Sequence, residues 1–367
     1  MYSRRRFLVD TSLTVLGLSL HPVSSCNEQK DVRMKKEKQS GKLGLALVGL
    51  GTYSTGELAP ALQETEHCYL AGIVTGSHEK AEKWKREHDL PASNIYNYDN
   101  FDSIRDNPDI DIIYVVLPNA LHAGYVERAA RAGKHVICEK PMAVTVEECD
   151  RMITACKEAG VKLSIGYRLH FEPHNQEIMR FAREKNFGAV KNIRAEHGMS
   201  DTGGWRIDKR LAGGGPLMDV GIYCVQACRY ATGLEPIAVR AQEGAKKRPE
   251  KFKTVEESLS WQMEFPGGIV CECKTSYSET QNLLRVEYEN GWAELSPAYK
   301  YEGIRGKTSS GDMNFEQVNQ QARQMDDFAL AIKNNRATPV PGAMGRQDVK
   351  ILQAIYRAME TGNRVEI

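Results

Sequence analysis

Two glycines near the start of the chain have the spacing of a turn that binds a dinucleotide. Gly49 and Gly51 directly follow the apolar run 45–48 and precede a stretch that can form a helix. Glycines there permit a tight turn and let the backbone approach a pyrophosphate at a helix N-terminus. The third glycine of the usual pattern is absent, because Ser54 stands in its place and Gly56 follows two residues later. The predicted cofactor-binding turn consists of Gly49, Gly51, Thr52 and Tyr53.

The end of the second predicted strand bears on which nicotinamide dinucleotide binds. NAD enzymes usually carry an acidic residue there, which binds the ribose 2′-hydroxyl. This chain instead reads Val74-Thr75-Gly76-Ser77-His78-Glu79-Lys80. The hydroxyls of Thr75 and Ser77, together with the Lys80 ammonium, could hold a 2′-phosphate. The alternative is that this segment is a plain polar turn in which the lysine is solvated and binds no phosphate. We favour the phosphate-binding role, and therefore NADP over NAD as the cofactor.

The elements that must position these residues alternate between buried strands and amphipathic helices over residues 43–166. Apolar runs at 45–49, 73–74, 112–116 and 135–138 are typical of parallel strands buried on both faces, and 120–132 and 144–159 have helical spacing. This alternation predicts right-handed βαβ units in an N-terminal Rossmann domain with a doubly wound parallel sheet.

Residues 167–345 have a different pattern, which predicts an α+β domain for substrate binding and oligomerisation. Helices are expected at 172–185 and 217–230, and strands at 190–197, 237–241, 259–265, 269–277, 283–288 and 292–295. Turn signals between the strands indicate an open, mostly antiparallel sheet with flanking helices, in which successive strands pair as a meander. Helices at 315–333 and 347–361 are expected to pack back on the body, the second within a C-terminal segment 346–367.

The composition argues against several classes of function. The 367 residues include 49 basic and 48 acidic ones, a net charge of +1, with no basic run in the folded region. This balance argues against nucleic acid as the main partner. The nine cysteines form no C-x-x-C pair and no cluster with zinc spacing, so we expect no metal. Cys149, Cys156, Cys224 and Cys228 lie at helical spacings in apolar patterns and are expected to be buried thiols.

The first 26 residues resemble an export signal. Ser3-Arg4-Arg5-Arg6-Phe7-Leu8 fits the twin-arginine pattern, and a short apolar stretch follows at 13–20. Small residues precede Cys26, as in a lipoprotein processing site, so this cysteine is a candidate for a lipid anchor. The polar stretch 27–42 is expected to be a linker. We expect a periplasmic protein, the alternative being an ordinary basic start of a cytoplasmic one.

Other motifs in the chain resemble those of the Gfo/Idh/MocA oxidoreductase family. They are Glu139-Lys140-Pro141, Leu117-Pro118-Asn119 with His122, Ile165-Gly166-Tyr167-Arg168, and the run from Leu211 to Tyr223. The similarity extends over nearly everything after residue 42 and is strongest to the glucose–fructose oxidoreductase branch. It implies an NADP-dependent enzyme that transfers hydride between the cofactor and a sugar, either an aldose or ketose or a related polyol.

The resemblance also assigns roles to individual residues. Lys140 would contact the reacting hydroxyl and lower the pKa of Tyr223, Tyr223 would act as the base, and Asp219 would orient the sugar. Residues four apart lie on one face of a helix, so the side chains of Asp219 and Tyr223 can meet. The other cofactor-site residues implied are Leu117, Asn119, His122, Glu139, Lys140 and Arg168, and those beside the substrate are Trp205 and Arg206.

Two other functions remain open on the same fold. An NAD-dependent glycosidase would be expected to carry an acid after the second strand, and a non-catalytic nucleotide-binding sugar sensor would lack the three catalytic residues. The chain also departs from the family pattern at Phe171 and Pro216, and its Lys/Glu-rich segment before the first strand leaves permanent cofactor retention open. We expect a homo-oligomer, a dimer or a tetramer.

Overall fold

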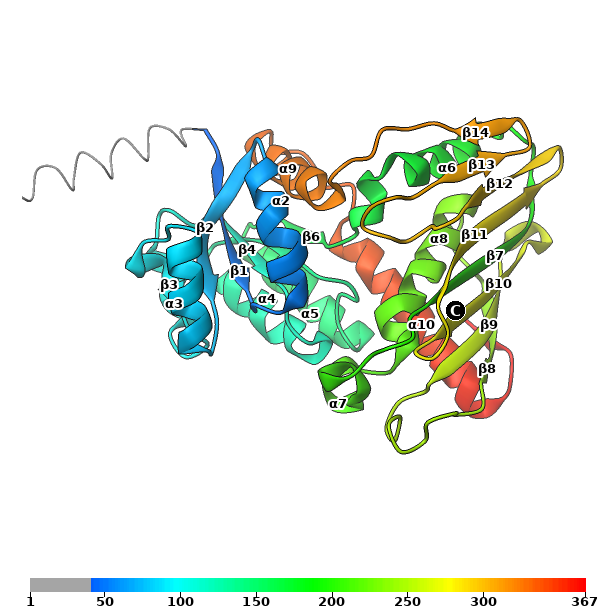
Figure 1. Cartoon of the computed structure of the whole chain (residues 1–367), viewed down its shortest axis with the longest axis horizontal. Helices are drawn as coiled ribbons and strands as arrows, with labels where there is room; N and C mark the ends of the chain where they lie inside the picture. The colour runs from blue at the N-terminus through cyan, green and yellow to red at the C-terminus, as the bar shows by residue number, and fades with distance from the viewer. Residues whose placement is uncertain (1–40) are drawn as a thin grey trace, which may run out of the picture. The chain divides into compact units, whose positions relative to one another are not determined.

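The computed structural model describes residues 41–367 of the chain, in which two β-sheets carry most of the core (Figure 1). The first sheet has the strand order β3-β2-β1-β4-β5-β6, and its strands are parallel. They are β1 (Leu43–Val48), β2 (Cys68–Val74), β3 (Ile95–Tyr96), β4 (Ile112–Val115), β5 (His135–Cys138) and β6 (Leu163–Ile165). The order reverses at β1, and such a switch point opens a crevice at the carboxyl ends of the strands. The predicted Rossmann fold is confirmed.

The helices of this first domain follow its strands. They are α2 (Ala59–Glu64), α3 (His78–Glu87), α4 (His122–Arg131) and α5 (Val146–Glu158), with a π-helical turn at Ser54–Leu58. Short 3₁₀ turns lie at Ala92–Asn94, Phe101–Asp106 and Asn119–Leu121. The sequence did not predict α3, because Ala81 and Trp84 are the only buried residues on this charged helix. Two apolar positions make too weak a periodic signal.

One face of the parallel sheet is covered by a helix from much later in the chain, α9 (Gln320–Lys333). Met325 and Phe328 of α9 are buried in one cluster with Leu45 and Leu47 of β1. The expectation that this region packs back on the body is therefore confirmed. The helix begins later than predicted because the Asn319 side chain accepts a hydrogen bond from the Ala322 amide and caps it.

The second sheet has nine strands in the order β14-β13-β12-β11-β7-β10-β9-β8-β15. They are β7 (Val190–Gly198), β8 (Ala238–Glu243), β9 (Ser258–Glu264), β10 (Val270–Ser276), β11 (Gln281–Tyr288), β12 (Gly291–Leu295), β13 (Gly306–Thr308), β14 (Gly311–Met313) and β15 (Val365–Glu366). The mostly antiparallel sheet is confirmed, but the simple meander is wrong. Strand β7 lies between β10 and β11 and pairs in parallel with β10, a long-range pairing that strand patterns do not encode.

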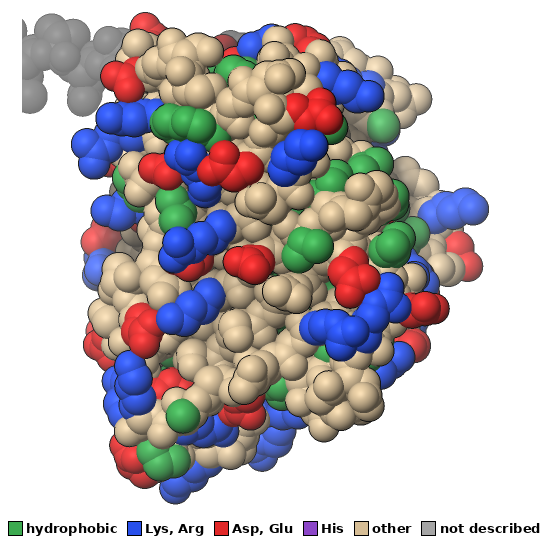
Figure 2. All heavy atoms as spheres, turned by 90° about the vertical axis from the view of Figure 1, so that its right-hand side faces the viewer, with side chains coloured by type: hydrophobic (Ala, Val, Ile, Leu, Met, Phe, Trp, Pro, Cys, Tyr) green, Lys and Arg blue, Asp and Glu red, His purple; other side chains and the backbone are tan. Residues whose placement is uncertain are grey.

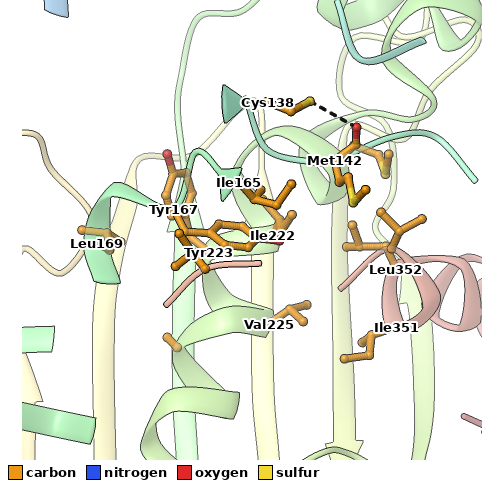
Figure 3. Close-up of a cluster of buried hydrophobic side chains, with 14 of the residues drawn as sticks. Cys138, Met142, Ile165, Tyr167, Leu169, Ile222, Tyr223, Val225, Ile351 and Leu352 are labelled. Atoms are coloured by element: carbon orange, nitrogen blue, oxygen red, sulfur yellow. Dashed lines mark hydrogen bonds between the residues drawn. The ribbon is translucent and has the colours of Figure 1, made fainter. Parts of the chain in front are cut away.

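Helices line the side of this sheet that faces the Rossmann domain (Figure 1). They are α6 (Pro173–Glu184), α8 (Ile222–Thr232) and α10 (Gly342–Thr361). Elsewhere in this domain are the short helix α7 (Lys209–Ala212), a π-helical turn at Leu217–Gly221 and 3₁₀ turns at Arg168–Phe171, Gly204–Ile207 and Pro266–Gly268. Ile165 and Tyr167, Ile222 and Tyr223, and Leu352 of α10 belong to one buried cluster (Figure 3). This cluster holds the start of α8 against the end of β6.

The cysteines and the N-terminal region complete the description. All eight cysteines among the described residues are buried free thiols, and they include Cys149, Cys156, Cys224 and Cys228, for which the apolar patterns predict burial. The predicted export signal and Cys26 lie outside the described residues. Over residues 41–367, no helix has the length and apolar character needed to cross a bilayer.

Candidate active site

The predicted glycine turn lies at the carboxyl end of β1. Gly49 has φ +94°, and an added Cβ would lie 2.4 Å from the Val116 carbonyl oxygen, so only glycine fits. Ser54, in place of the third glycine, donates a hydrogen bond of 2.6 Å to the Gly49 carbonyl and closes the turn. A Cβ on Gly51 would meet nothing within 4 Å. The outer side of the turn is therefore open to a ligand.

A cleft of about 540 Å³ lies over this turn. It is lined by most of the predicted cofactor residues, namely Gly49, Gly51, Thr52, Tyr53, Thr75, Ser77, Lys80, Leu117, Asn119, Glu139 and Lys140. It is also lined by Trp205, Arg206, Asp219 and Tyr223 from the second domain, and by Tyr98 and Tyr301, which the sequence analysis missed. The two missed tyrosines lie in segments without a strand or helix signal.

The groups at the end of β2 fit a phosphate. Ser77 caps α3 by accepting a hydrogen bond from the Lys80 amide, and the Lys80 ammonium donates 2.9 Å to the Leu50 carbonyl, over the glycine turn. The two carboxylates that line the cleft, Glu139 and Asp219, come from other segments. Hydroxyls, an ammonium and a helix N-terminus favour an anion over a neutral 2′-hydroxyl.

Glu139, which lines the cleft, is held in place by a buried hydrogen-bond network. Its Oε1 accepts 2.6 Å from the Tyr114 hydroxyl, which itself accepts 2.8 Å from the Gln324 amide. Burial raises the pKa of Glu139, and the neighbouring Lys140 ammonium opposes that rise. A Cβ on Gly166 would lie 2.5 Å from Glu139 Oε1, which explains the glycine at that position.

Lys140, Asp219 and Tyr223 meet beside the cleft. The Lys140 ammonium donates 2.7 Å to the backbone carbonyl of Asp219 and lies 3.9 Å from its Oδ1. It also lies 4.5 Å from the centroid of the Tyr223 ring, against the ring face. A cation at that distance interacts favourably with the negative face of the ring. The structure brings together the three residues that the resemblance implies.

The start of α8 is held by a buried carboxylate. Asp219 lies in the π-helical turn before α8, rather than in a regular helix as the sequence predicts. Glu256 accepts hydrogen bonds from the Gly215 amide (3.0 Å), the Leu217 amide (3.1 Å) and the Tyr356 hydroxyl (2.8 Å). π-helical turns are common at functional sites. Glu256 therefore anchors the segment that carries Asp219.

The Asp219 carboxylate has two partners besides Lys140. Its Oδ2 accepts 3.0 Å from Arg206 Nε and 3.0 Å from the Tyr277 hydroxyl. Burial and the Asp219 charge raise the pKa of Tyr277 well above its ordinary value. Sequence reasoning missed Tyr277, since a tyrosine at the end of an apolar strand is typical of a core residue.

A second hollow, the inner pocket, adjoins the cleft and has a volume of about 520 Å³. It is lined by Glu57, Lys140, Arg168, His197, Met199, Arg206, Asp219, Val220, Tyr223, Asn282, Tyr299, Lys300, Tyr301 and Glu302. Five of these also line the cleft, namely Lys140, Arg206, Asp219, Tyr223 and Tyr301. The dinucleotide side and the inner pocket therefore meet at the predicted catalytic residues.

Comparison with known families confirms the resemblance. The model of an oxidoreductase family with an NAD-binding Rossmann fold matches residues 43–167, and that of the GFO/IDH/MocA C-terminal domain matches residues 175–294. The chain belongs to the Gfo/Idh/MocA oxidoreductase family. Residues 43–167 therefore form an NAD-binding Rossmann domain of this family, and the open glycine turn at the cleft fits a dinucleotide.

Individual relatives cover nearly the whole chain. A D-xylose 1-dehydrogenase [NADP(+)] of Haloarcula marismortui is 28% identical over 343 residues, covering 88% of this chain and 92% of the relative. The aldose-aldose oxidoreductase from Caulobacter crescentus, solved with glycerol, is 42% identical with a TM-score of 0.87, covering 89% of this chain and 100% of that one. A levoglucosan dehydrogenase in complex with NADH and levoglucosan is 21% identical with a TM-score of 0.75, covering 89% and 99%, and shows the shared fold.

Arg168 of this Gfo/Idh/MocA enzyme lines the inner pocket rather than the cleft. Its guanidinium donates to the Lys300 (3.0 Å) and Tyr299 (2.6 Å) carbonyls and to the Gln320 side chain. The guanidinium also lies 5.1 Å from the centroid of the Tyr223 ring. Two cations, those of Lys140 and Arg168, therefore lie against this ring. Arg168 Nε is buried and has no hydrogen-bond partner among residues 41–367.

Two histidines near the site differ in role. His122 is fully buried, and its ring nitrogens lie 3.0 Å from the Pro141 carbonyl and 2.8 Å from the Leu117 carbonyl. It joins two loops beneath the cleft rather than lining it. His197, which the sequence analysis missed, lines the inner pocket beside Tyr223. Burial, with Arg168 and Lys140 nearby, lowers its pKa to about 4.

Among residues 41–367, no group of three or more His, Cys, Asp or Glu side chains is placed to hold a metal ion.

Proposed function

We propose that this enzyme oxidises a sugar with NADP⁺, as an aldose dehydrogenase or an aldose–aldose oxidoreductase. The observation that carries the proposal is that the cleft and the inner pocket share Lys140, Asp219 and Tyr223. The relatives named for D-xylose and for aldoses support the sugar, and the NADP(+) in the first name supports the cofactor.

Each residue of the site has a separate role in the oxidation of a carbinol. NADP⁺, when bound, supplies the nicotinamide that accepts hydride. Lys140 donates a hydrogen bond to the substrate oxygen. The phenol oxygen of Tyr223 accepts the proton of the substrate hydroxyl and passes its own proton to solvent. The cations of Lys140 and Arg168 lie against the Tyr223 ring, 4.5 Å and 5.1 Å from its centroid, and hold it beside the substrate. Asp219, held by Arg206 and Tyr277, accepts a hydrogen bond from a neighbouring sugar hydroxyl.

Single-turnover reduction of NADP⁺ by a panel of aldoses, ketoses and polyols tests this function. We expect the nicotinamide absorbance to rise with at least one aldose, and to rise less at the same concentration of NAD⁺. A panel in which no sugar reduces either cofactor contradicts the proposal. Equal amounts of alditol and aldonate from one aldose would identify an exchange between two sugars.

The two alternative functions lack support at the site. An NAD-dependent glycosidase of this fold is expected to have an acidic residue after β2, but the chain has Thr75, Gly76 and Ser77 there. A sensor would not need Lys140 and Tyr223 to meet beside the cleft, as they do.

We also propose that the enzyme is exported by the twin-arginine route, with Cys26 as the candidate site of a lipid anchor.

We further propose that the enzyme forms a homo-oligomer. The helices pack on one side of the nine-stranded sheet (Figure 1). Figure 2 shows the right-hand side of that view, where Lys and Arg side chains are interspersed with Asp and Glu. Pairs such as Arg285 with Glu294 (3.3 Å) occur on this sheet. Light scattering on the purified protein measures its molecular mass in solution. The mass of a monomer would contradict the proposed homo-oligomer.

A further inference from the structure

Two polar side chains from neighbouring strands of the nine-stranded sheet form part of the wall of the inner pocket. His197 lies near the end of β7 and Asn282 near the start of β11, and the two residues are direct partners in the antiparallel register of these strands. Residues paired in this way have their side chains on the same face of a sheet. Both residues line the inner pocket, which is also lined by the predicted catalytic residues. His197 and Asn282 therefore lie side by side in this pocket.

The hydrogen bonding of His197 leaves one of its ring nitrogens as an acceptor. Its Nδ1 lies 3.3 Å from the backbone carbonyl oxygen of Gln281. Because a carbonyl oxygen can only accept, Nδ1 carries the hydrogen and donates it, and Nε2 of the neutral ring is then an acceptor. Nε2 has no hydrogen-bond partner among residues 41–367 and is not enclosed, since the ring is partly exposed in the inner pocket. Its lone pair is therefore available to a donor in this pocket.

The surroundings of His197 keep its ring neutral near pH 7. Burial lowers the pKa of His197 to about 4, and the cations of Arg168 and Lys140 add to this effect. A group with so low a pKa is a poor base for the proton of a carbinol. The ring packs against Tyr223, with the two centroids 5.5 Å apart, and against Tyr299 at 4.9 Å. His197 is thus held beside Tyr223 as a hydrogen-bond acceptor rather than as a base.

The side chain of Asn282 presents the opposite polarity. Its Oδ1 accepts hydrogen bonds from the backbone amides of Ala298 (2.6 Å) and Tyr299 (2.7 Å), which fixes the orientation of the carboxamide. Its Nδ2 has no hydrogen-bond partner in the described part of the chain and is not enclosed, since Asn282 is partly exposed where it lines the pocket. The Nδ2 hydrogens are therefore free to donate. A fixed acceptor and a fixed donor stand next to each other on one wall.

We infer that His197 and Asn282 are specificity-determining residues that recognise two neighbouring hydroxyls of the sugar unit that reacts at Tyr223. The inference rests on the proposed function. One hydroxyl donates to Nε2 of His197, and the other accepts from Nδ2 of Asn282. Neither is the oxygen that Lys140 holds, and no bond forms or breaks at this pair. A sugar that lacks the donating hydroxyl leaves the acceptor unpaired in the pocket, which should lower kcat/KM about 10- to 100-fold.

The first test uses the wild-type enzyme, NADP⁺ and the aldose with the highest kcat/KM, together with the monodeoxy and monodeoxyfluoro derivatives of that aldose. Fluorine bound to carbon accepts a hydrogen bond weakly but cannot donate one. At the position that His197 recognises, the deoxy and the deoxyfluoro derivatives should both lose at least about tenfold in kcat/KM. At the position that Asn282 recognises, the deoxyfluoro derivative should recover part of the loss that the deoxy derivative shows.

The second test repeats these measurements in two variants. His197→Phe keeps a ring between the two tyrosines but removes the acceptor, so the deoxy derivative at the first position should no longer be poorer than the parent aldose. Asn282→Asp keeps the oxygen that accepts from the two backbone amides but replaces the donor with a second oxygen, so the recovery by fluorine at the second position should be lost. Because each ratio compares two sugars on the same variant, a general effect of the substitution on activity cancels.

His170→Phe and Asn192→Asp are the matched controls. His170 is also a partly buried histidine that packs on aromatic rings, and Asn192 is exposed on β7; neither residue lines the inner pocket. Both controls should show the ratios of the wild type. Wild-type ratios in either His197→Phe or Asn282→Asp overturn the paired recognition while leaving the proposed function intact. No reduction of NADP⁺ by any sugar instead contradicts the proposed function.

Discussion

The Lys140 ammonium lies 4.5 Å from the centroid of the Tyr223 ring and 2.7 Å from the backbone carbonyl of Asp219. The Asp219 carboxylate is farther from it, 3.9 Å at Oδ1, and is held mainly by Arg206 and Tyr277. The carboxylate and the ammonium are thus positioned separately. This leaves Lys140 with hydrogens to donate to a substrate oxygen, because an ammonium has three donors.

The first prediction concerns Tyr223. Replacing it with phenylalanine removes the hydroxyl that relays the proton while keeping the ring that packs on Lys140. Single-turnover NADP⁺ reduction by an aldose should slow about 10²–10⁴-fold, the usual effect of losing a positioned acid–base group. Lys140→Ala should slow it similarly. NADP⁺ binding, measured by fluorescence titration, should change little in Tyr223→Phe.

The double variant provides the check on that mechanism. Because the two residues act on one proton and one oxygen, the loss in Lys140→Ala/Tyr223→Phe should be smaller than the product of the single losses. Near-wild-type turnover in Tyr223→Phe would assign proton transfer to another residue, with Asp219 as the next candidate.

The second prediction concerns cofactor choice at Ser77. Ser77→Asp keeps the cap on α3, since aspartate is also a good N-cap, but adds a charge where a 2′-phosphate would bind. Two unit charges about 4 Å apart interact by about 4 kcal/mol at an effective dielectric of about 20, an upper bound for the shift toward NAD. The measurement is the ratio of the NADP⁺ and NAD⁺ dissociation constants.

Ser93→Asp is the control, because it adds the same charge at a residue that does not line the cleft. Tighter binding of NAD⁺ than of NADP⁺ by the wild-type protein would show that Thr75, Ser77 and Lys80 do not select the phosphate.

The third prediction assigns Tyr277 as a positioning residue. Tyr277→Phe keeps the ring that stacks on Phe252 at 6.0 Å but leaves the Asp219 carboxylate with one partner fewer. We expect kcat/KM for the aldose to fall about tenfold, the effect of about one hydrogen bond to a charged group, with NADP⁺ affinity unchanged. A purely structural role would instead lower the thermal midpoint and weaken both ligands together.

The fourth prediction is a pH dependence of stability from His197. Its pKa falls from an ordinary 6.5 to about 4 on folding, so between these values the unfolded chain binds a proton that the folded chain does not. The free energy of unfolding should therefore fall as the pH drops from 6.5 to 4, by at most about 3 kcal/mol from this residue. Urea unfolding at several pH values measures it. His197→Phe should flatten the dependence, whereas replacement of the exposed His78 by glutamine should not.

The fifth prediction concerns export and depends on residues outside the described part of the chain. Replacing Arg4 and Arg5 with lysines should leave the protein in the cytoplasm, as fractionation followed by immunoblotting would show. Cys26→Ala should release an exported, membrane-bound protein into the soluble periplasmic fraction. Unchanged delivery in the arginine variant contradicts the twin-arginine route.

The sequence by itself determined the parts of this protein that depend on local pattern. Continuous apolar runs predicted β1, β4 and β5 because strands buried on both faces leave such runs, and the glycines at 49 and 51 marked the turn. The family motifs identified Lys140, Asp219 and Tyr223. Local signals failed where an element carries few apolar residues, as in α3 with its two buried positions.

Only the tertiary structure decided which distant segments meet. It placed β7 between β10 and β11, set α9 on the first sheet, and brought Tyr277 to Asp219 and His197 to the Tyr223 ring. These contacts join residues up to hundreds of positions apart, and a residue's type does not record its partner across that distance. The adjoining hollows around Tyr301 arise in the same way, because each wall comes from a different part of the chain.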